Sequence, residues 1–106
     1  MSASKIIIED NGRVPNIHPG EILREDFLIG SDIAVADVAA GAGIALDELN
    51  ALLGGATPVT AETALRLSRY FGLSEQFFLG LQNHYDLEEA KLTYQADLDR
   101  IVRRAA

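Results

Sequence analysis

Signals for the start and end of helices follow one another closely between Ile17 and about Leu81, and they restrict this part of the chain to short helices. His18-Pro19-Gly20-Glu21 predicts a helix start, because it combines a polar cap, a proline at the first helical position and an acid three residues after the cap. Gly43 and the pair Gly54-Gly55 each predict a helix end, since glycine can adopt the left-handed conformation found there. A chain divided in this way is expected to fold as a bundle of short helices.

Apolar residues between these signals recur at the three- and four-residue spacing of one helix face. They predict five helices, the first beginning at Pro19, the next three covering Val35–Ala42, Ala45–Leu53 and Ala61–Phe71, and the last beginning at Glu75. Thr60 and Ser74 are suitable N-caps for the last two helices. The expected fold class is all-α: a five-helix domain with a short N-terminal extended segment and a C-terminal helix.

The 106 residues are enough for one small core and divide into three stretches. Residues 1–16 form an N-terminal extension, in which the β-branched run Ile6-Ile7-Ile8 predicts a short strand. Residues 17–90 form the helical domain, and residues 91–106 form a helical tail. One apolar stripe is expected along this tail, formed by Tyr94, Leu98, Ile101 and Val102.

The composition excludes several classes of protein. The chain has no cysteine, which rules out disulfides, thiolate catalysis and cysteine-ligated metal sites. Its apolar runs are too short to cross a membrane and its N-terminus lacks the apolar region of a secretory signal, so a cytoplasmic protein is expected. Sixteen acidic and nine basic residues give a net charge of −7, which disfavours non-specific binding to nucleic acid and suits a basic partner.

Neither a catalytic site nor a metal site is expected. The chain has no phosphate-binding glycine loop and no recognisable pairing of serine with histidine. His18 and His84 are the only histidines and lack the spacing of paired metal ligands, so no metal and no cofactor is predicted. His18 is interpreted as a helix cap and His84 as a surface or partner-facing residue.

The second and third predicted helices, joined by a short turn, form a helix-turn-helix pattern, in which the second helix enters the major groove of DNA. Short helix pairs occur in any small helical bundle, so the pattern by itself also allows a purely structural role.

Three longer strings carry a resemblance to a known family. Ile17–Leu28 (IHPGEILREDFL) resembles the N-terminal signature of the HigA antitoxins, which belong to the phage-repressor-like (Cro/CI, XRE) helix-turn-helix class. Thr60–Gly72 resembles the fourth helix of that family, and Ser74–Gln82 with Tyr85-Asp86-Leu87 resembles its closing signature. Together the matches cover about residues 17–90. The resemblance implies a five-helix, usually dimeric repressor that represses its own operon and neutralises HigB, a small basic ribosome-dependent ribonuclease toxin encoded beside it.

The positions that would read DNA depart from the family pattern. At the start of the recognition helix, where the family tends to carry Ser, Arg and Gln, this chain has Ala45, Leu46, Asp47, Glu48 and Asn50. Asp47 and Glu48 can accept a hydrogen bond from cytosine N4, but acids in a first turn also stabilise a helix by about 0.3–1 kcal/mol each. No Lys or Arg occurs between Arg24 and Arg66, so phosphate contacts would come from Arg24, Arg66 or Arg69.

Aromatic residues of the last helix are candidates for a dimer contact. Phe77 and Phe78 are adjacent, so at least one should face the core, and the other is exposed unless a partner covers it. Core packing of both is the alternative. With Tyr85, they form the predicted dimer interface.

The sequence therefore predicts a HigA-like antitoxin, with operator DNA, a basic toxin and a second copy of itself as partners. The alternative is a repressor-like dimerisation or protein-interaction module that has lost DNA binding, which the cation-free interval favours. A conventional single-gene transcription factor is a third possibility, and the acidity of the chain counts against it.

Overall fold

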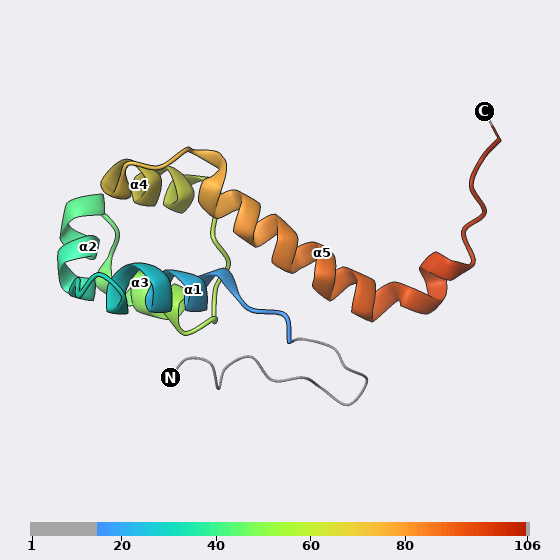
Figure 1. Ribbon diagram of the computed structural model, residues 1–106, viewed down its shortest axis with the longest axis horizontal. Coiled ribbons are helices and arrows are strands. Elements are labelled where there is room, and N and C mark those ends of the chain that lie inside the picture. Colours follow the sequence, from blue (N-terminus) through green and yellow to red (C-terminus); the bar gives the residue numbers. More distant parts are fainter. Residues whose placement is uncertain (1–14, 106) are drawn as a thin grey trace.

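The computed structural model describes residues 15–105, and every regular element in that range is helical (Figure 1). The elements are α1 (Pro19–Ile22), the π-helical segment η2 (Leu23–Ile29), α2 (Val35–Ala42), α3 (Leu46–Leu53), α4 (Ala61–Phe71) and α5 (Gln76–Asp99). Since η2 continues α1 without a break, the two make the first of five helices, and the predicted all-α class is confirmed. The predicted strand at Ile6-Ile7-Ile8 lies outside the described residues.

The first helix begins as predicted and then widens. The Nδ1 atom of His18 accepts a hydrogen bond from the N–H of Gly20 at 2.9 Å, so the predicted cap is confirmed. From Leu23 the backbone is π-helical, and the N–H of Gly30 donates to the carbonyl of Glu25, five residues earlier. Side-chain spacing predicted a helix here without its wider turn, because short π-helical segments have no clear sequence signal.

The core lies where the first four helices meet the start of α5. Its largest fully buried side chains include Phe78, Leu23, Leu49, Leu67 and Val38. Phe78 also belongs to a group of four aromatic rings from three elements, which pack edge to face or tilted with centroids 5.1 to 6.4 Å apart. The group consists of Phe27, Phe71, Phe77 and Phe78. Aromatic contacts of this kind add to the burial of apolar surface and connect η2, α4 and α5.

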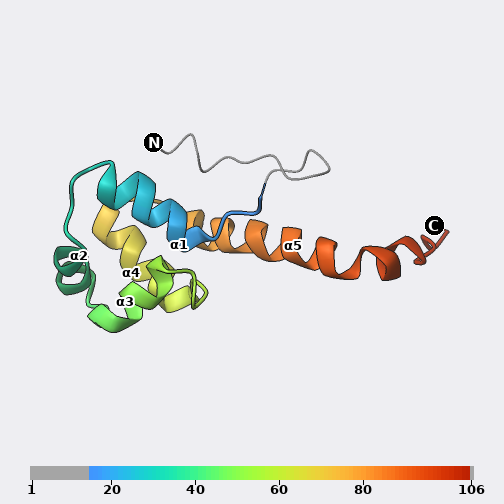
Figure 2. The same cartoon turned by 90° about the horizontal axis from the view of Figure 1, so that it is seen from below.

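Helix α5 packs on the domain only over its first part, and its remainder projects away (Figures 1 and 2). It begins at Gln76, one residue later than predicted, and the Ser74 hydroxyl accepts from the N–H of Gln76 at 3.3 Å. Tyr94 has non-helical angles (φ −111°, ψ 17°) and kinks the helix. Because α5 ends at Asp99, the prediction that Ile101 and Val102 continue a helical stripe is wrong. Both side chains are largely exposed to solvent, so no tertiary packing among the described residues holds them in a helix.

Between residues 15 and 105, none of the helices combines the length and the apolar character needed to cross a membrane.

We expect Gly20→Ala to destabilise the fold strongly. A methyl group at Gly20 would overlap the backbone carbonyl of Leu52 at the end of α3, so α1 and α3 would have to separate. Overpacking of this kind costs about 1–3 kcal/mol or more in the free energy of unfolding, measurable by urea denaturation.

Gly80→Ala is the matched control. It lies inside α5, and a methyl group added there would meet no atom within 4 Å, so the substitution should raise stability by about 0.5–1 kcal/mol. Equal stability of the two variants would show that the α1–α3 contact does not restrict residue 20.

Candidate nucleic-acid interface

Helices α2 and α3 form a helix-turn-helix with a three-residue turn. Gly43 follows α2 in the left-handed conformation (φ 71°), and its N–H donates to the carbonyl of Ala39. Ile44 is buried in the core, and Ala45 is the extended N-cap of α3. The predicted helix end at Gly43 is confirmed, and the buried turn holds α3 in a defined orientation to α2.

Helix α3 has one buried and one exposed face. Leu49, Leu52 and Leu53 point into the core. All the residues predicted to read DNA are exposed at the N-terminal end and outer side of the helix, namely Ala45, Leu46, Asp47, Glu48 and Asn50. The fold therefore brings the predicted residues together on an accessible surface, and their contact with DNA stays a prediction.

Asp47 stabilises the first turn of its own helix, α3. The N-cap Ala45 makes no side-chain hydrogen bond, and the Asp47 carboxylate accepts from the N–H of Glu48 at 2.9 Å. A carboxylate in this position satisfies a free N–H and opposes the positive end of the helix dipole. This contact favours helix stabilisation over base reading for Asp47.

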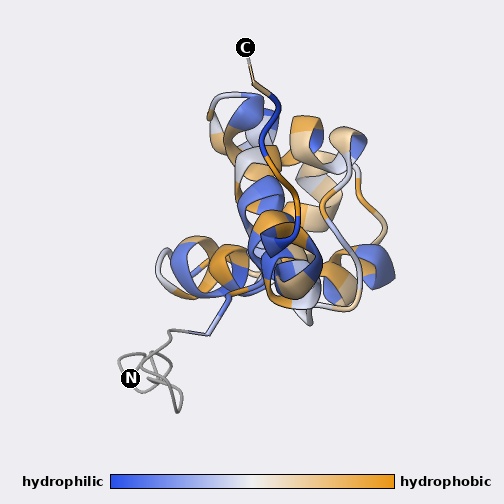
Figure 3. Ribbon diagram, turned by 90° about the vertical axis from the view of Figure 1, so that its right-hand side faces the viewer, coloured by the Kyte–Doolittle hydropathy of each residue, from blue (hydrophilic) through white to orange (hydrophobic). Residues whose placement is uncertain are grey.

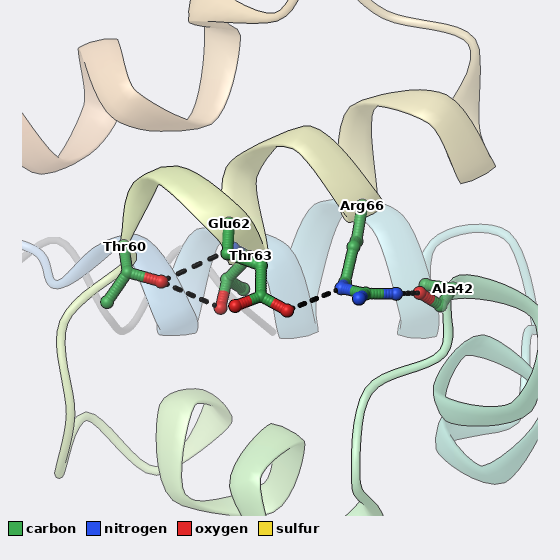
Figure 4. Close-up of polar contacts among 5 residues, drawn as sticks. All are labelled: Ala42, Thr60, Glu62, Thr63 and Arg66. Atoms are coloured by element: carbon green, nitrogen blue, oxygen red, sulfur yellow. Dashed lines mark hydrogen bonds and ion pairs between the residues drawn. The ribbon is translucent and has the colours of Figure 1, made fainter.

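Arg66 connects α4 to the end of α2 (Figure 4). The Thr60 hydroxyl caps α4 by accepting from the N–H of Thr63 at 3.3 Å. One turn later, the Arg66 Nε lies 2.9 Å from a carboxylate oxygen of Glu62, and its Nη1 donates to the carbonyl of Ala42 at 3.3 Å. Arg66 thus satisfies a carbonyl at the negative end of the α2 dipole.

The same guanidinium lies over the turn of the helix-turn-helix. A methyl group at Gly43 would be 2.8 Å from the Arg66 Nη1 atom, which is the flexible end of that side chain, so it is the left-handed backbone angle that favours glycine here. The sequence pattern had indicated Arg66 only as a phosphate contact, because a bond to a carbonyl 24 residues away has no local signal.

Two grooves border α3. A groove of about 460 Å³ lies toward α4 and is lined by Asp47, Glu48, Glu62 and Arg66 among others. A larger groove of about 800 Å³ lies between the first helix and the end of α3, and its lining includes Glu21, Arg24, Asp32, Asn50, Gly54 and Gly55. Arg24 pairs with Glu25 at 3.1 Å and leaves 41% of its side chain exposed. Across the described residues, Arg24 and Arg66 are the basic side chains that line these grooves.

Two side-chain amides hold neighbouring segments on α5. The buried Gln82 accepts from the N–H of Val59 at 2.7 Å, which fixes the segment between α3 and α4, and donates to Asp86 at 2.9 Å. Asn16 donates to the carbonyl of Tyr85 and to the carboxylate of Glu89, at 2.9 and 3.0 Å. The sequence analysis identified neither amide. For Gln82 there was a signal, because a glutamine stands there among the apolar positions of a helix.

The two histidines and the three predicted dimer residues differ in how far they are buried. His18 packs edge-on against Tyr85, with ring centroids 5.0 Å apart, while His84 is exposed. Phe78 is in the core with 1% exposure, and Phe77 leaves 39% of its surface exposed. Within residues 15–105, no three acidic or histidine side chains are grouped as a metal site.

No family model matches the chain. It is, however, 39% identical over 83 residues to the virulence-associated protein I of Dichelobacter nodosus, a match that covers 78% of this chain and 77% of that protein.

Two solved structures have the same fold as this chain. One is the Pseudomonas aeruginosa antitoxin HigA with the higBA promoter, with a TM-score of 0.78, 33% identity, and coverage of 87% of this chain and 100% of that chain. The other is the antitoxin GraA in complex with its operator, with a TM-score of 0.77, 35% identity, and coverage of 87% and 93%.

We expect Gln82→Ala to destabilise the domain, because it leaves the buried N–H of Val59 without its acceptor. A buried unsatisfied donor costs about 1–3 kcal/mol in the free energy of unfolding. Gln95→Ala, which removes an exposed amide bonded to Asp99, is the control and should change stability by less than about 0.5 kcal/mol. Similar urea midpoints for both variants would contradict the role given to Gln82.

Proposed function

Because the chain belongs to the HigA-type antitoxin family of helix-turn-helix proteins, we propose that it binds operator DNA through α2 and α3, represses its own operon, and neutralises a basic ribonuclease toxin. The observation that carries this proposal is the exposed face of α3 on a fold shared with two antitoxins whose structures contain their promoter or operator.

The proposed DNA contact relies on few charges. Asp47 and Glu48 stand on the face that would enter the major groove, and Arg66 is already bonded to Ala42 and Glu62. Arg24 is then the better-placed cation, since it lines the groove that also contains Asn50 and Gly54. Few phosphate contacts imply weak non-specific affinity and a shallow dependence on salt.

The proposed antitoxin role is stoichiometric binding without turnover, in the cytoplasm. The net charge of −7 supports a basic protein partner, because opposite charges speed association and favour the correct orientation. The acidic surface and the two ends, residues 1–16 and 91–106, are the proposed toxin contacts, and Ile6-Ile7-Ile8 is proposed to add to a sheet edge of the toxin or of a second copy.

We also propose a homodimer, as the family implies. Of its predicted interface residues, Phe78 is enclosed by the core and Tyr85 is half-buried against His18. Phe77 is thus the residue of the three with the largest surface to offer a partner.

The second candidate function is a protein-interaction module without an operator. Two features favour this second function: the acids of α3 and the hydrogen bond of Arg66 to the Ala42 carbonyl. Both reduce the attraction of the exposed face of α3 to phosphate.

Fluorescence anisotropy with DNA from upstream of the gene, against scrambled DNA, tests the operator proposal. Arg24→Gln should weaken operator binding and reduce the slope of log affinity against log salt by about 1, measured between about 50 and 200 mM salt.

Arg69→Gln provides the comparison between two candidate phosphate contacts, because Arg69 is exposed on α4 but, unlike Arg24, lines neither groove. Selective binding with unequal slopes for the two variants supports the assignment of Arg24. Absence of selective binding by the unsubstituted protein would favour the interaction module.

Calorimetric titration with the small basic protein encoded beside this gene tests the antitoxin role. A stoichiometric complex that weakens as salt rises is expected, because the two net charges are opposite. Removal of residues 1–14 should lower the affinity, and unchanged toxin binding and dimerisation of the shortened chain would contradict the role of Ile6-Ile7-Ile8.

A further inference from the structure

One leucine of α3 remains exposed in the folded domain. Apolar and hydrophilic residues alternate along the helical ribbons (Figure 3), and the other three leucines of α3 point into the core. Leu46 leaves 46% of its surface exposed at the N-terminal end of the helix and lines neither groove. Single exposed leucines are common in proteins, so the neighbours of Leu46 decide whether it belongs to a binding surface.

Asn50 lies one turn further along α3, on the same side as Leu46. Residues four apart on a helix have Cβ atoms about 5–6 Å from each other, so the two side chains present one continuous surface. The backbone carbonyl of Asn50 accepts from the N–H of Gly54 at 3.0 Å, while its exposed side-chain amide makes no hydrogen bond to another described residue. The amide therefore keeps both its donor and its acceptor for a ligand.

The acids of α3 border a different groove. Asp47 and Glu48 line the groove toward α4, whereas Asn50 lines the groove on the side of the first helix, together with Arg24. The Asp47 carboxylate also accepts from the N–H of Glu48 within its own helix. A duplex that approaches α3 from the side of Arg24 would meet Leu46, Asn50 and a guanidinium.

The chemistry of Leu46 and Asn50 matches one kind of base pair. In the major groove, thymine presents a C5-methyl group to apolar side chains, and adenine presents N7 and N6, which an asparagine amide binds with two hydrogen bonds. Guanine is recognised mainly by Arg or Lys, and the chain has neither between Arg24 and Arg66. Acids accept from the N4 of cytosine, but the phosphates of the duplex repel them.

We propose that Leu46 and Asn50 recognise A·T base pairs of the operator in the major groove. Leu46 packs against the C5-methyl group of a thymine. The Asn50 amide donates to N7 of an adenine and accepts from its N6 amino group, and Arg24 contacts a phosphate beside them. This inference rests on the operator binding in the proposed function, and it adds which bases are recognised and which side of α3 faces the DNA.

The small number of cations gives these base contacts a larger share of the affinity than in a basic repressor. Contacts of a leucine and an amide are made by neutral groups and release no counterions. Discrimination between A·T and G·C pairs should therefore persist as salt rises, while the overall affinity falls.

Removal of single methyl groups from the DNA tests the contact of Leu46. The thymines of the duplex from upstream of the gene are replaced one at a time by deoxyuridine, which keeps the base pair and lacks only the methyl group. In fluorescence anisotropy at about 50 mM salt, at least one replacement should weaken binding by the unsubstituted protein about three- to fivefold. Leu46→Ala should bind the unmodified duplex more weakly by a similar factor and should not respond to that replacement.

Leu65→Ala is the matched control for Leu46→Ala. Leu65 is also 46% exposed, but it lies on α4 and lines neither groove. This variant should bind each duplex as the unsubstituted protein does.

Replacement of single adenines by 7-deazaadenine, which lacks the N7 acceptor, tests Asn50 in the same way. At least one replacement should weaken binding about threefold or more, and Asn50→Ala should no longer respond to it. Asn83→Ala, which removes an exposed amide of α5, is the control and should keep the response. Circular dichroism and urea denaturation show that each variant retains the fold.

The outcomes separate this inference from the operator proposal. Absence of selective binding by the unsubstituted protein overturns both. A variant that remains as sensitive to its modified base as the unsubstituted protein overturns the contact assigned to that residue and leaves operator binding in place. Loss of selectivity in Glu48→Gln, with no effect of Leu46→Ala, assigns recognition to the acidic side of α3 and also overturns the inference.

Discussion

The close contact between the start of the first helix and the end of α3 determines where the exposed face of α3 lies. Gly20 sits against the backbone carbonyl of Leu52 with no space for a side chain, so these two helices cannot separate or slide without loss of packing. The larger groove lies between the first helix and the end of α3, and Arg24 and Asn50 both line it. Gln82 then fixes the segment after α3 through Val59. These contacts hold α3 from its buried side and leave its outer face accessible.

The charges on the exposed face of α3 are unfavourable for DNA, although the fold is shared with antitoxins solved with DNA. The fold is that of antitoxins solved with DNA, yet the exposed face of α3 carries two acids, and its nearest cations each have an acidic neighbour. Asp47 stabilises the first turn of its own helix, and Arg66 stabilises the end of α2. Both charges therefore contribute to the folded state before any ligand is bound, which leaves a smaller share of the charge for phosphate recognition.

Helix α5 has two parts with different physical roles. Its first part supplies Phe78 and Gln82 to the core and anchors Asn16 through the Tyr85 carbonyl. Its second part, from Glu89 onward, is exposed throughout and includes the exposed apolar side chains of Leu92, Tyr94 and Leu98. The kink at Tyr94 lies within the second part.

Local sequence signals determined the number and most boundaries of the helices, but not the π-helical turn of Leu23–Ile29. The caps at His18 and Thr60 and the left-handed turn at Gly43 depend on interactions within a few residues, so their side chains and backbone angles could be read in order along the chain. The tertiary structure alone decided how Arg66 meets Ala42, how Gln82 meets Val59, and which of two adjacent phenylalanines is buried. These contacts join residues far apart in sequence, and their partners are chosen by helix packing, for which spacing along one helix contains no information.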